Sequence, residues 1–450
     1  MRTLARAASV AADESDVATP NAAWHAMAPD WELIADLLGG TRAMRAAGER
    51  WLPREPKESL EAYRIRLSRT VLFNGLGRAI QTLSGKPFAK PVTLADGADP
   101  RLRALCHDLD LGGRDLTTFA RDVLRAALTD GVTHILVDYP EAAALGETLH
   151  DERVRGARPY FVHIPARDLI GWQVDRAGRL ERVRIRETVS EREGTWGEAA
   201  VPQIRVLEPG LWSVWRRPRG REDAPWRRMA GGRTTLEHIP LVSVYAGRTG
   251  FLTARPPLID LAWLNLAHWQ SSSDQRHILH VARVPILFAR NLKVGEDGVE
   301  IGPNRLIQGD GDGADLRYVE HSGAAIAAGR QDLADLEDRM AVMGLDLLVG
   351  RSGGVTATER AIDAARSDSA LTGLVREVED GLSRAFALAA DWMDLDPAAA
   401  GRVTVDPDLG IDPQEAQEVD LLLKARLAGE IDRPTFLAEI RRRGILSDRA

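Results

Sequence analysis

The sequence has almost no cysteine, because Cys106 is the only one among its 450 residues. A single cysteine excludes an intrachain disulfide framework and any zinc site built on cysteines, and it fits a reducing compartment. No apolar run approaches the roughly 20 residues that a membrane-spanning helix requires. The N-terminal stretch MRTLARAASVAADESD carries arginines but no apolar core, so we expect neither a signal peptide nor contact with a membrane.

An excess of positive charge is missing as well. The 59 lysines and arginines stand against 66 aspartates and glutamates, which gives a net charge of −7. Such a chain does not coat nucleic acid, because neutralising phosphates requires clustered lysine and arginine. With 44% hydrophobic and 28% charged residues, the composition is that of a soluble protein with a hydrophobic core. The length exceeds that of a single compact core and predicts several domains.

Motifs of enzymes and metal sites are also absent. The run DGDGAD at 310–315 suggests a calcium loop, but an EF-hand would need glycine at Asp315 and glutamate at His321. HExxH does not occur. GRSGG at 350–354 matches GxSxG, but it follows a predicted helix, whereas the nucleophile turn of hydrolases follows a strand. His277 and His280 could share one helix face, yet no third metal ligand is in view. The sequence therefore predicts no enzyme, no cofactor and no metal site.

Helical and alternating patterns both occur, which predicts an α+β fold. Residues 1–30 show little periodicity and are expected to form a flexible arm, whereas helical spacing extends from Trp31 to about Ser84. A further helix is expected over Leu116–Leu128. Apolar or alternating segments predict strands at 132–139, 160–164, 180–189, 203–207, 211–216 and 239–245, separated by Gly-rich turns such as Gly231-Gly232. The arginine-rich run at 216–221 is expected to be a solvated loop.

The second half of the chain predicts long helices around a Gly-rich segment. One helix is expected over Leu258–Val281, entered through two prolines. A second is predicted by an apolar stripe at Leu333, Leu336, Met340, Met343 and Leu347. After Gly353-Gly354, a capping box at Thr356–Glu359 opens a long helix that Asp396-Pro397 ends. Short helices are expected after Pro413 and from about Asp432.

The order of these elements resembles the portal (head-to-tail connector) proteins of tailed double-stranded DNA phages and prophages. The resemblance extends from about Leu37 onward and rests on the order and spacing of segments, not on a catalytic signature. The segments that carry it are TRAMRAAGERWLPREPKESLEAYRIRLSRTVLFNGLGRAIQTLSGKPF (41–88), GVTHILVDYP (131–140), IPLVSVYAGRTG (239–250), PPLIDLAWLNLAHWQSSSDQRHILHVARVPILF (256–288), TATERAIDAARSDSALTGLVREVEDGLSRAFALAADWM (356–393) and LLLKARLAGEIDRPTFLAEIRRRGIL (421–446).

This resemblance implies a portal-like α+β fold. Its parts would be a flexible N-terminal arm (1–30), a mixed α/β wing (31–255), a first stem helix (256–282), a β-containing clip (283–325), a second stem helix (326–349), a tunnel loop (350–355), a long helix that returns to the wing (356–411) and a short helical crown (412–450).

The resemblance also implies a function and partners. Portal proteins form a homo-oligomeric ring, a dodecamer, at one capsid vertex of the virion, and the ring assembles in the host cytoplasm. Double-stranded DNA passes through its channel without sequence preference during packaging and ejection. The expected partners are the major capsid protein, the terminase large subunit and a neck or tail adaptor. A net negative charge suits a conduit, because each phosphate contact adds affinity that moving DNA must break.

Candidate site residues follow from the same resemblance. The channel would be lined by Asp332, Asp335, Asp338, Asp346, Arg351, Ser352, Gly353 and Gly354. The clip would contact the motor and adaptor through Phe288, Arg290, Lys293, Glu296, Asp297, Asp310 and Asp312. At 100° per residue, the four aspartates fall on one side of the second stem helix. Arg339 lies among them and could pair with Asp335. The face could instead point outward and only keep the stem soluble.

Two other classes of function stay open from the residues alone. The chain could be an enzyme, for instance a hydrolase with an unrecognised site in its α+β half. It could also be a scaffold-like interaction protein that never contacts DNA. The mass of the purified protein separates them, because a ring far above 49.3 kDa favours the conduit.

Overall fold

The computed structural model describes residues 16–140, 156–218, 220–221, 223–282, 286–290, 313, 315–319, 324–345, 370–406, 421–426 and 428–442, and it confirms the α+β class. Its α-helices are α1 (Ala22–Leu38), α2 (Gly40–Ala47), α3 (Leu60–Arg69), α4 (Gly75–Gly85), α5 (Pro100–Leu105), α6 (Leu116–Asp130), α8 (Ile259–Ala282), α9 (Ala324–Leu345), α11 (Ala370–Trp392) and α13 (Arg433–Arg442). Short 3-10 helices are η1 (Gly48–Arg50), η2 (Lys86–Phe88), η3 (Ala166–Asp168) and η4 (Pro397–Ala400).

The described strands form five antiparallel sheets. A five-stranded sheet has the order β4 (Leu169–Val174), β5 (Leu180–Glu193), β6 (Gly197–Glu208), β7 (Leu211–Arg216) and β8 (Arg227–Arg233). A three-stranded sheet has the order β3 (Tyr160–Pro165), β2 (Val132–Asp138) and β9 (Leu241–Tyr245). Three strand pairs complete the set: β1 (Thr93–Leu94) with β14 (Val403–Thr404), β10 (Arg248–Gly250) with β11 (Thr253–Ala254), and β12 (Ile286–Arg290) with β13 (Asp315–Val319).

The chain divides into two compact units. The first contains residues 1–35, 76–260 and 342–450, and the second contains residues 36–75 and 261–341. Both sheets of three or more strands belong to the first unit. The second unit holds α2, α3, most of α8 and α9, and the β12–β13 pair. Residues 36–75 therefore group with the two long helices, although they precede them by about two hundred residues.

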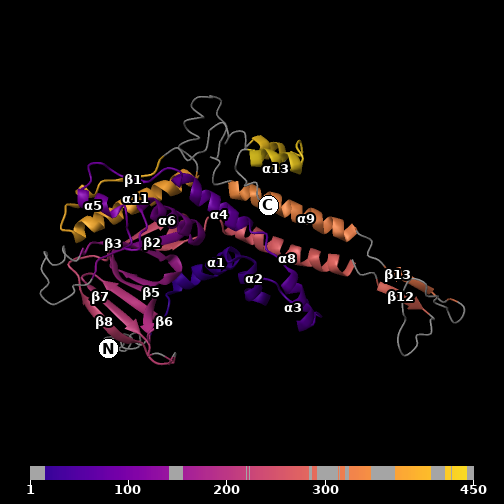
Figure 1. Ribbon diagram of the computed structural model, residues 1–450, viewed down its shortest axis with the longest axis horizontal. Coiled ribbons are helices and arrows are strands. Elements are labelled where there is room, and N and C mark those ends of the chain that lie inside the picture. Colours follow the sequence, from indigo (N-terminus) through magenta and orange to yellow (C-terminus); the bar gives the residue numbers. More distant parts are fainter. Residues whose placement is uncertain are drawn as a thin grey trace, which may run out of the picture. The chain divides into compact units, whose positions relative to one another are not determined.

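The first unit is built around the three-stranded sheet and two helices. Helices α6 and α11 contact that sheet and one another (Figure 1). Phe161 on β3 lies edge-on between Phe119 of α6, at 6.0 Å, and Phe386 of α11, at 5.1 Å, measured between ring centroids. All three rings are fully buried. Trp392, the last residue of α11, donates its indole N–H to the Val137 carbonyl at 2.9 Å.

The ends of α6 follow from its sequence. Asp115 accepts the backbone N–H of Thr118 at 2.7 Å and so caps the first turn. At the other end Gly131 adopts φ of 80°, a left-handed conformation that residues with a side chain rarely adopt. A Cβ at this position would also overlap the backbone of Arg255. The predicted helix and the strand that follows it, β2, are both confirmed.

The predicted flexible arm over 1–30 is corrected at its C-terminal end, because α1 begins at Ala22. Asn21 accepts the Trp24 N–H at 2.8 Å and caps this helix. Trp31 is buried and donates its indole N–H to the Asp130 carbonyl at 2.8 Å. The periodicity was obscured by Pro29, which lies inside the helix.

A second correction concerns Gly231-Gly232, which the sequence placed in a turn. Both residues lie inside β8, the edge strand of the five-stranded sheet (Figure 1). Edge strands tolerate glycine because only one of their sides is paired. Gly232 also leaves room for the indole of Trp212 on the neighbouring strand. Strand β4 was not predicted either.

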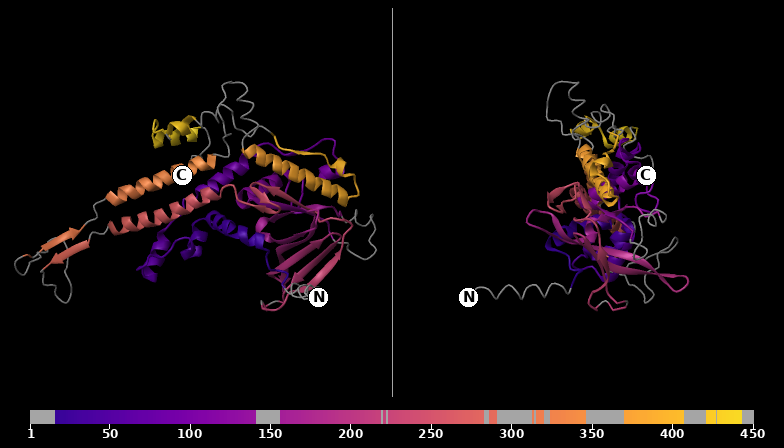
Figure 2. Two further views of the ribbon diagram at one scale, coloured as in Figure 1. Left: turned by 180° about the vertical axis from the view of Figure 1, so that it is seen from behind. Right: turned by 90° about the vertical axis from the view of Figure 1, so that its left-hand side faces the viewer.

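The second unit contains the two long helices and the strand pair that lies between them in the sequence. Helices α8 and α9 lie side by side in both views, and β12 and β13 lie beyond their ends (Figure 1 and Figure 2). The register of the strand pair joins Ile286 to Val319 and Arg290 to Asp315. The sequence order of helix, β-segment and returning helix is therefore confirmed as an antiparallel arrangement within one chain.

The remaining predictions for the C-terminal part concern helix ends. Helix α11 ends at Trp392, and Asp396 caps η4 instead by accepting the Ala398 N–H at 2.9 Å. The capping box at 356–359 lies outside the described residues. Helix α13 confirms the last predicted helix, with Asp432 accepting the Thr435 N–H at 2.9 Å. Its Phe436 and Ile440 are buried against Leu422, Leu423 and Ile431.

Candidate functional site

The inner side of α8 is unusually polar. Five of its polar side chains are less than a tenth exposed, namely Asn265, His268, Ser272, Ser273 and Gln275. Buried polar groups need hydrogen-bond partners, since an unpaired one costs about 1–3 kcal/mol. The partners of this helix come from α9 and from the segment 51–73, which explains why these parts form one compact unit.

His268 and Gln275 of α8 contact α9 directly. His268 approaches Glu337, with 3.3 Å between its Nε2 and a carboxylate oxygen. Gln275 donates its amide N–H to the carbonyl of Ile326 at 2.9 Å. The contacts lie on the same side of α8, two turns apart. From the first contact to the second, the residue number rises along α8 and falls along α9, so the two helices are antiparallel. Leu336 and Met340 of α9 are buried.

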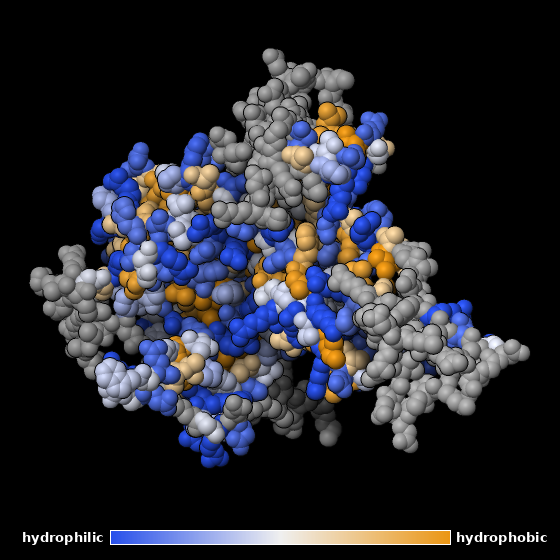
Figure 3. Space-filling view, turned by 45° about the vertical axis from the view of Figure 1, so that its right-hand side comes forward, coloured by the Kyte–Doolittle hydropathy of each residue, from blue (hydrophilic) through white to orange (hydrophobic). Residues whose placement is uncertain are grey.

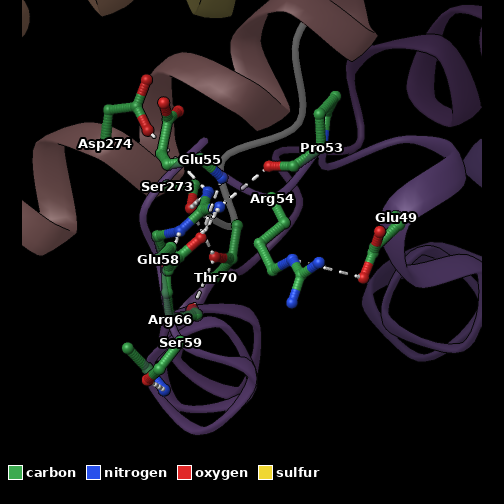
Figure 4. A network of polar contacts seen from close by, with 11 residues as sticks. Glu49, Pro53, Arg54, Glu55, Glu58, Ser59, Arg66, Thr70, Ser273 and Asp274 are labelled. Carbon is green, nitrogen blue, oxygen red and sulfur yellow. Dashed lines mark hydrogen bonds and ion pairs between the residues drawn. The ribbon is translucent and has the colours of Figure 1, made fainter.

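The segment 51–73 is fixed to α8 by a buried arginine. Arg66 on α3 binds both carboxylate oxygens of Glu58 at 2.8 Å, and its Nη2 also reaches the carbonyl of Pro53 at 2.9 Å (Figure 4). Its Nη1 donates to Ser273 Oγ of α8 at 3.3 Å. The side chains of Arg66 and Glu58 are only 5% and 10% exposed. The hydrogen bonds from Arg66 lower the pKa of Glu58, which stays ionised.

A cavity of about 540 Å³ opens beside this ion pair. Its lining combines the exposed Glu55, Lys57, Asp274 and His277 with the buried pair. Burial raises the pKa of Asp274, although Arg66 at 4.0 Å acts in the opposite direction. The lining mixes both signs of charge and suits polar contacts. No pattern in the sequence predicts this cavity, because nothing distinguishes Arg66 from Arg64 and Arg69.

The predicted channel acids that the structure describes lie on α9. Asp332 and Asp335 are exposed, and Asp338 is half-buried. Gln331 donates to Asp335 at 2.7 Å, which replaces the suggested pairing with Arg339. The acids thus occupy a different side of α9 from the buried Leu336 and Met340, as expected. Their exposure is compatible both with a channel lining and with an outer surface.

Two of the predicted clip residues lie on β12. Phe288 is 41% exposed, and the guanidinium of Arg317 on β13 stacks on its ring at 5.4 Å from the centroid. Arg290 is exposed at the end of the same strand. Strands β12 and β13 pair with each other, so any β contact to another subunit would use their outer edges.

The other predicted site residues lie outside the described part of the chain. In the proposed channel these are Asp346, Arg351, Ser352, Gly353 and Gly354, and in the proposed clip they are Lys293, Glu296, Asp297, Asp310 and Asp312.

The first unit, which holds both larger sheets and is called the α+β unit below, contains a serine–histidine pair of the kind that hydrolases use. His134 on β2 hydrogen-bonds Ser243 of β9 at 2.9 Å, and the two residues face each other across the strand pair. His134 is only 1% exposed, so a substrate has no access to its ring. Burial also raises the pKa of the Cys106 thiol to about 11, which leaves little reactive thiolate at neutral pH.

The described surface adds two observations. In the space-filling view polar residues predominate, and the apolar ones form small separate groups (Figure 3). No described helix combines the length and apolar character needed to cross a bilayer. Within the same residues, no three histidine, cysteine or acidic side chains gather as they would around a metal ion.

Comparison with known proteins gives one family match and several similar structures. Residues 257–393 match a family described as a domain of unknown function (DUF4055). No curated protein matches.

Among solved structures, a chain in the neck of an empty GTA particle, computed with C6 symmetry, shares 15% identity and a TM-score of 0.38 over 79% of this chain and 86% of that one. A chain in the virion of a native gene transfer agent (GTA) particle shares 16% identity and a TM-score of 0.38, over 80% and 87%. A chain in the neck of a native GTA particle, computed with C12 symmetry, shares 14% identity and a TM-score of 0.37, over 88% and 98%.

Proposed function

We propose that this chain is a portal protein, a subunit of a ring at one capsid vertex through which DNA is packaged and ejected. In this proposal α8 and α9 are the stem helices, β12 and β13 belong to the clip, and the α+β unit is the main part of the wing. The protein has no catalytic role. Its partners are other copies of itself, the major capsid protein, the terminase large subunit and a neck or tail adaptor.

One observation carries the proposal, namely the antiparallel pair of α8 and α9 with a β-hairpin between them in the chain. Short isolated hairpins are marginally stable in water. A two-stranded hairpin with an exposed Phe288 therefore suits a surface that other proteins cover. The order of the segments along the sequence, which resembles portal proteins throughout, supports the same assignment.

We expect deletion of residues 290–315 to abolish DNA-filled particles while the α+β unit remains folded. The deletion removes every proposed clip contact except Phe288 but leaves both sheets of the first unit intact. Particles are counted by electron microscopy, and the fold of the purified variant is checked by circular dichroism. DNA-filled particles at the normal yield would contradict the assignment of this segment.

We also propose that the acidic side of α9 faces the channel. Replacing Asp332, Asp335 and Asp338 together by asparagine is expected to leave ring assembly intact, because none of the three is fully buried. DNA retention should become less sensitive to salt, since less repulsion remains for ions to screen. The measurement is the fraction of DNA retained by particles at 50 and 500 mM NaCl. An unchanged salt dependence, or a ring structure with these carboxylates outside, would refute the orientation.

A further inference from the structure

The side of α8 from which His268 and Gln275 contact α9, called its contact seam here, is polar, whereas paired helices usually place apolar residues there. Asn265, His268, Ser272 and Gln275 recur at intervals of three, four and three, which is the spacing of the core positions in paired helices. All four are buried. The matching seam of α9 is almost entirely apolar and consists of Ile326, Gly329, Leu333, Leu336 and Met340. A polar seam against an apolar one packs less favourably than two apolar seams would. Hydrophobic packing therefore does not explain why these polar residues lie on α8.

Two positions of this seam select individual partners on α9. The amide of Gln275 donates to the Ile326 carbonyl at 2.9 Å, and a Cβ at residue 329 would overlap the Gln275 side-chain oxygen. A side chain at residue 329 would therefore displace the Gln275 amide from its position. Two turns away, His268 faces Glu337 at 3.3 Å. Among the described residues, neither the His268 Nδ1 nor the Gln275 oxygen has a hydrogen-bond partner, so the hydrogen bonding of each side chain depends on its one contact to α9.

We propose that His268 and Gln275 form a register lock, which holds α8 and α9 in one longitudinal alignment. Sliding α9 by one helical turn would bring Leu333 or Ala341 opposite His268 in place of Glu337. It would also bring Ala325 or Leu333 opposite Gln275 in place of Gly329. Both polar groups would then be buried without a partner, and the neighbouring side chain would overlap Gln275. Buried polar residues at core positions of helix pairs are known to specify register at a cost in stability.

The test uses disulfide formation as a reporter of the alignment, in a Cys106→Ala background. Counted from the His268–Glu337 contact in antiparallel order, residue 272 falls opposite residue 333, so the pair Ser272→Cys with Leu333→Cys reports the native register. The pair Ser272→Cys with Leu336→Cys reports a slip of about one turn. Both pairs are oxidised in the purified full-length chain, and the rates of disulfide formation are compared. With the lock intact, we expect the native pair to form at least about tenfold faster.

Changing His268 and Gln275 together to leucine should bring the two rates within about threefold, because an apolar seam accepts either alignment. Asn265→Leu is the matched control, since Asn265 donates to the Phe73 carbonyl in the segment 51–73. It should leave the tenfold preference unchanged. Gly329→Ala is a second probe, which should reduce the preference by displacing Gln275 while both polar residues stay in place.

Two results would overturn the register lock. If the native cysteine pair still forms its disulfide about tenfold faster after the double leucine change and after Gly329→Ala, other contacts align the helices. Equal rates in the unmodified seam would show that no alignment is enforced. The readout needs only the purified chain, so its outcome is independent of whether the protein forms a ring.

Discussion

Replacing Arg66 by methionine is expected to destabilise the unit that contains α8 and α9 by about 3–5 kcal/mol. The change leaves the Glu58 carboxylate, only 10% exposed, without its bidentate partner, and it removes the donors to Pro53 and Ser273. Removing one partner of a buried ion pair is costly because the other charge stays buried. Hydrogen exchange of residues 53–73 and of α8, followed by mass spectrometry, measures the loss locally.

The matched control for this change is Arg54→Met. Arg54 lies 3.9 Å from Glu49, and both side chains are largely exposed, so the expected loss is below about 1 kcal/mol. A second variant that changes Arg66 and Glu58 together to methionine should recover much of the stability, because no isolated charge remains. Equal losses for Arg66→Met and Arg54→Met would show that the ion pair does not fix the segment to α8.

Acidification from pH 6.5 to 4 is expected to destabilise the α+β unit by several kcal/mol. Burial lowers the pKa of His134 to about 3 and that of His163 to about 4, so the fold keeps both rings neutral. In the unfolded chain these groups have pKa values near 6.5. Their contribution to stability is therefore complete above pH 6.5 and is lost as the pH falls toward the two folded-state pKa values.

The measurement is the urea midpoint of the α+β unit at pH 7.5, 6.5, 5.5 and 4.5. Changing His134 to asparagine and His163 to glutamine should remove most of the decline, since the amides can still bond Ser243 and Thr133 without taking up a proton. His238→Gln is the control, because His238 is 49% exposed, and it should leave the decline unchanged. A decline that persists in the double variant would assign the acid sensitivity to carboxylates.

The sequence predicted most elements of the fold because local signals mark them. Asp115 and Gly131 delimit α6, the alternation at Val183–Arg186 marks β5, and the apolar stripe of α9 is periodic. Strand β8 was missed because its pairing with β7 is a tertiary contact that overrides the turn tendency of Gly231-Gly232. The start of α1 was missed for a similar reason, since the burial of Trp31 outweighs the irregular pattern around Pro29.

The candidate site was less accessible to sequence reasoning. The acidic side of α9 follows from helical spacing alone, and Asp332 and Asp335 are exposed as expected. The polar seam of α8 and the Arg66 ion pair depend on which residues meet across three separate segments of the chain. Helical spacing gives the direction of a side chain around its own helix, but it does not identify the surface opposite. For that reason helical spacing predicts neither the polar seam of α8 nor the Arg66 ion pair.

In the function we propose, this chain forms the channel ring at a capsid vertex. The most direct measurement is electron cryomicroscopy of particles that contain the chain with a C-terminal affinity tag. We expect one ring of this chain at a single vertex, with α8 and α9 around the axis and DNA density passing through it. A chain found at all vertices, on the capsid surface or absent from the particles would contradict the claim.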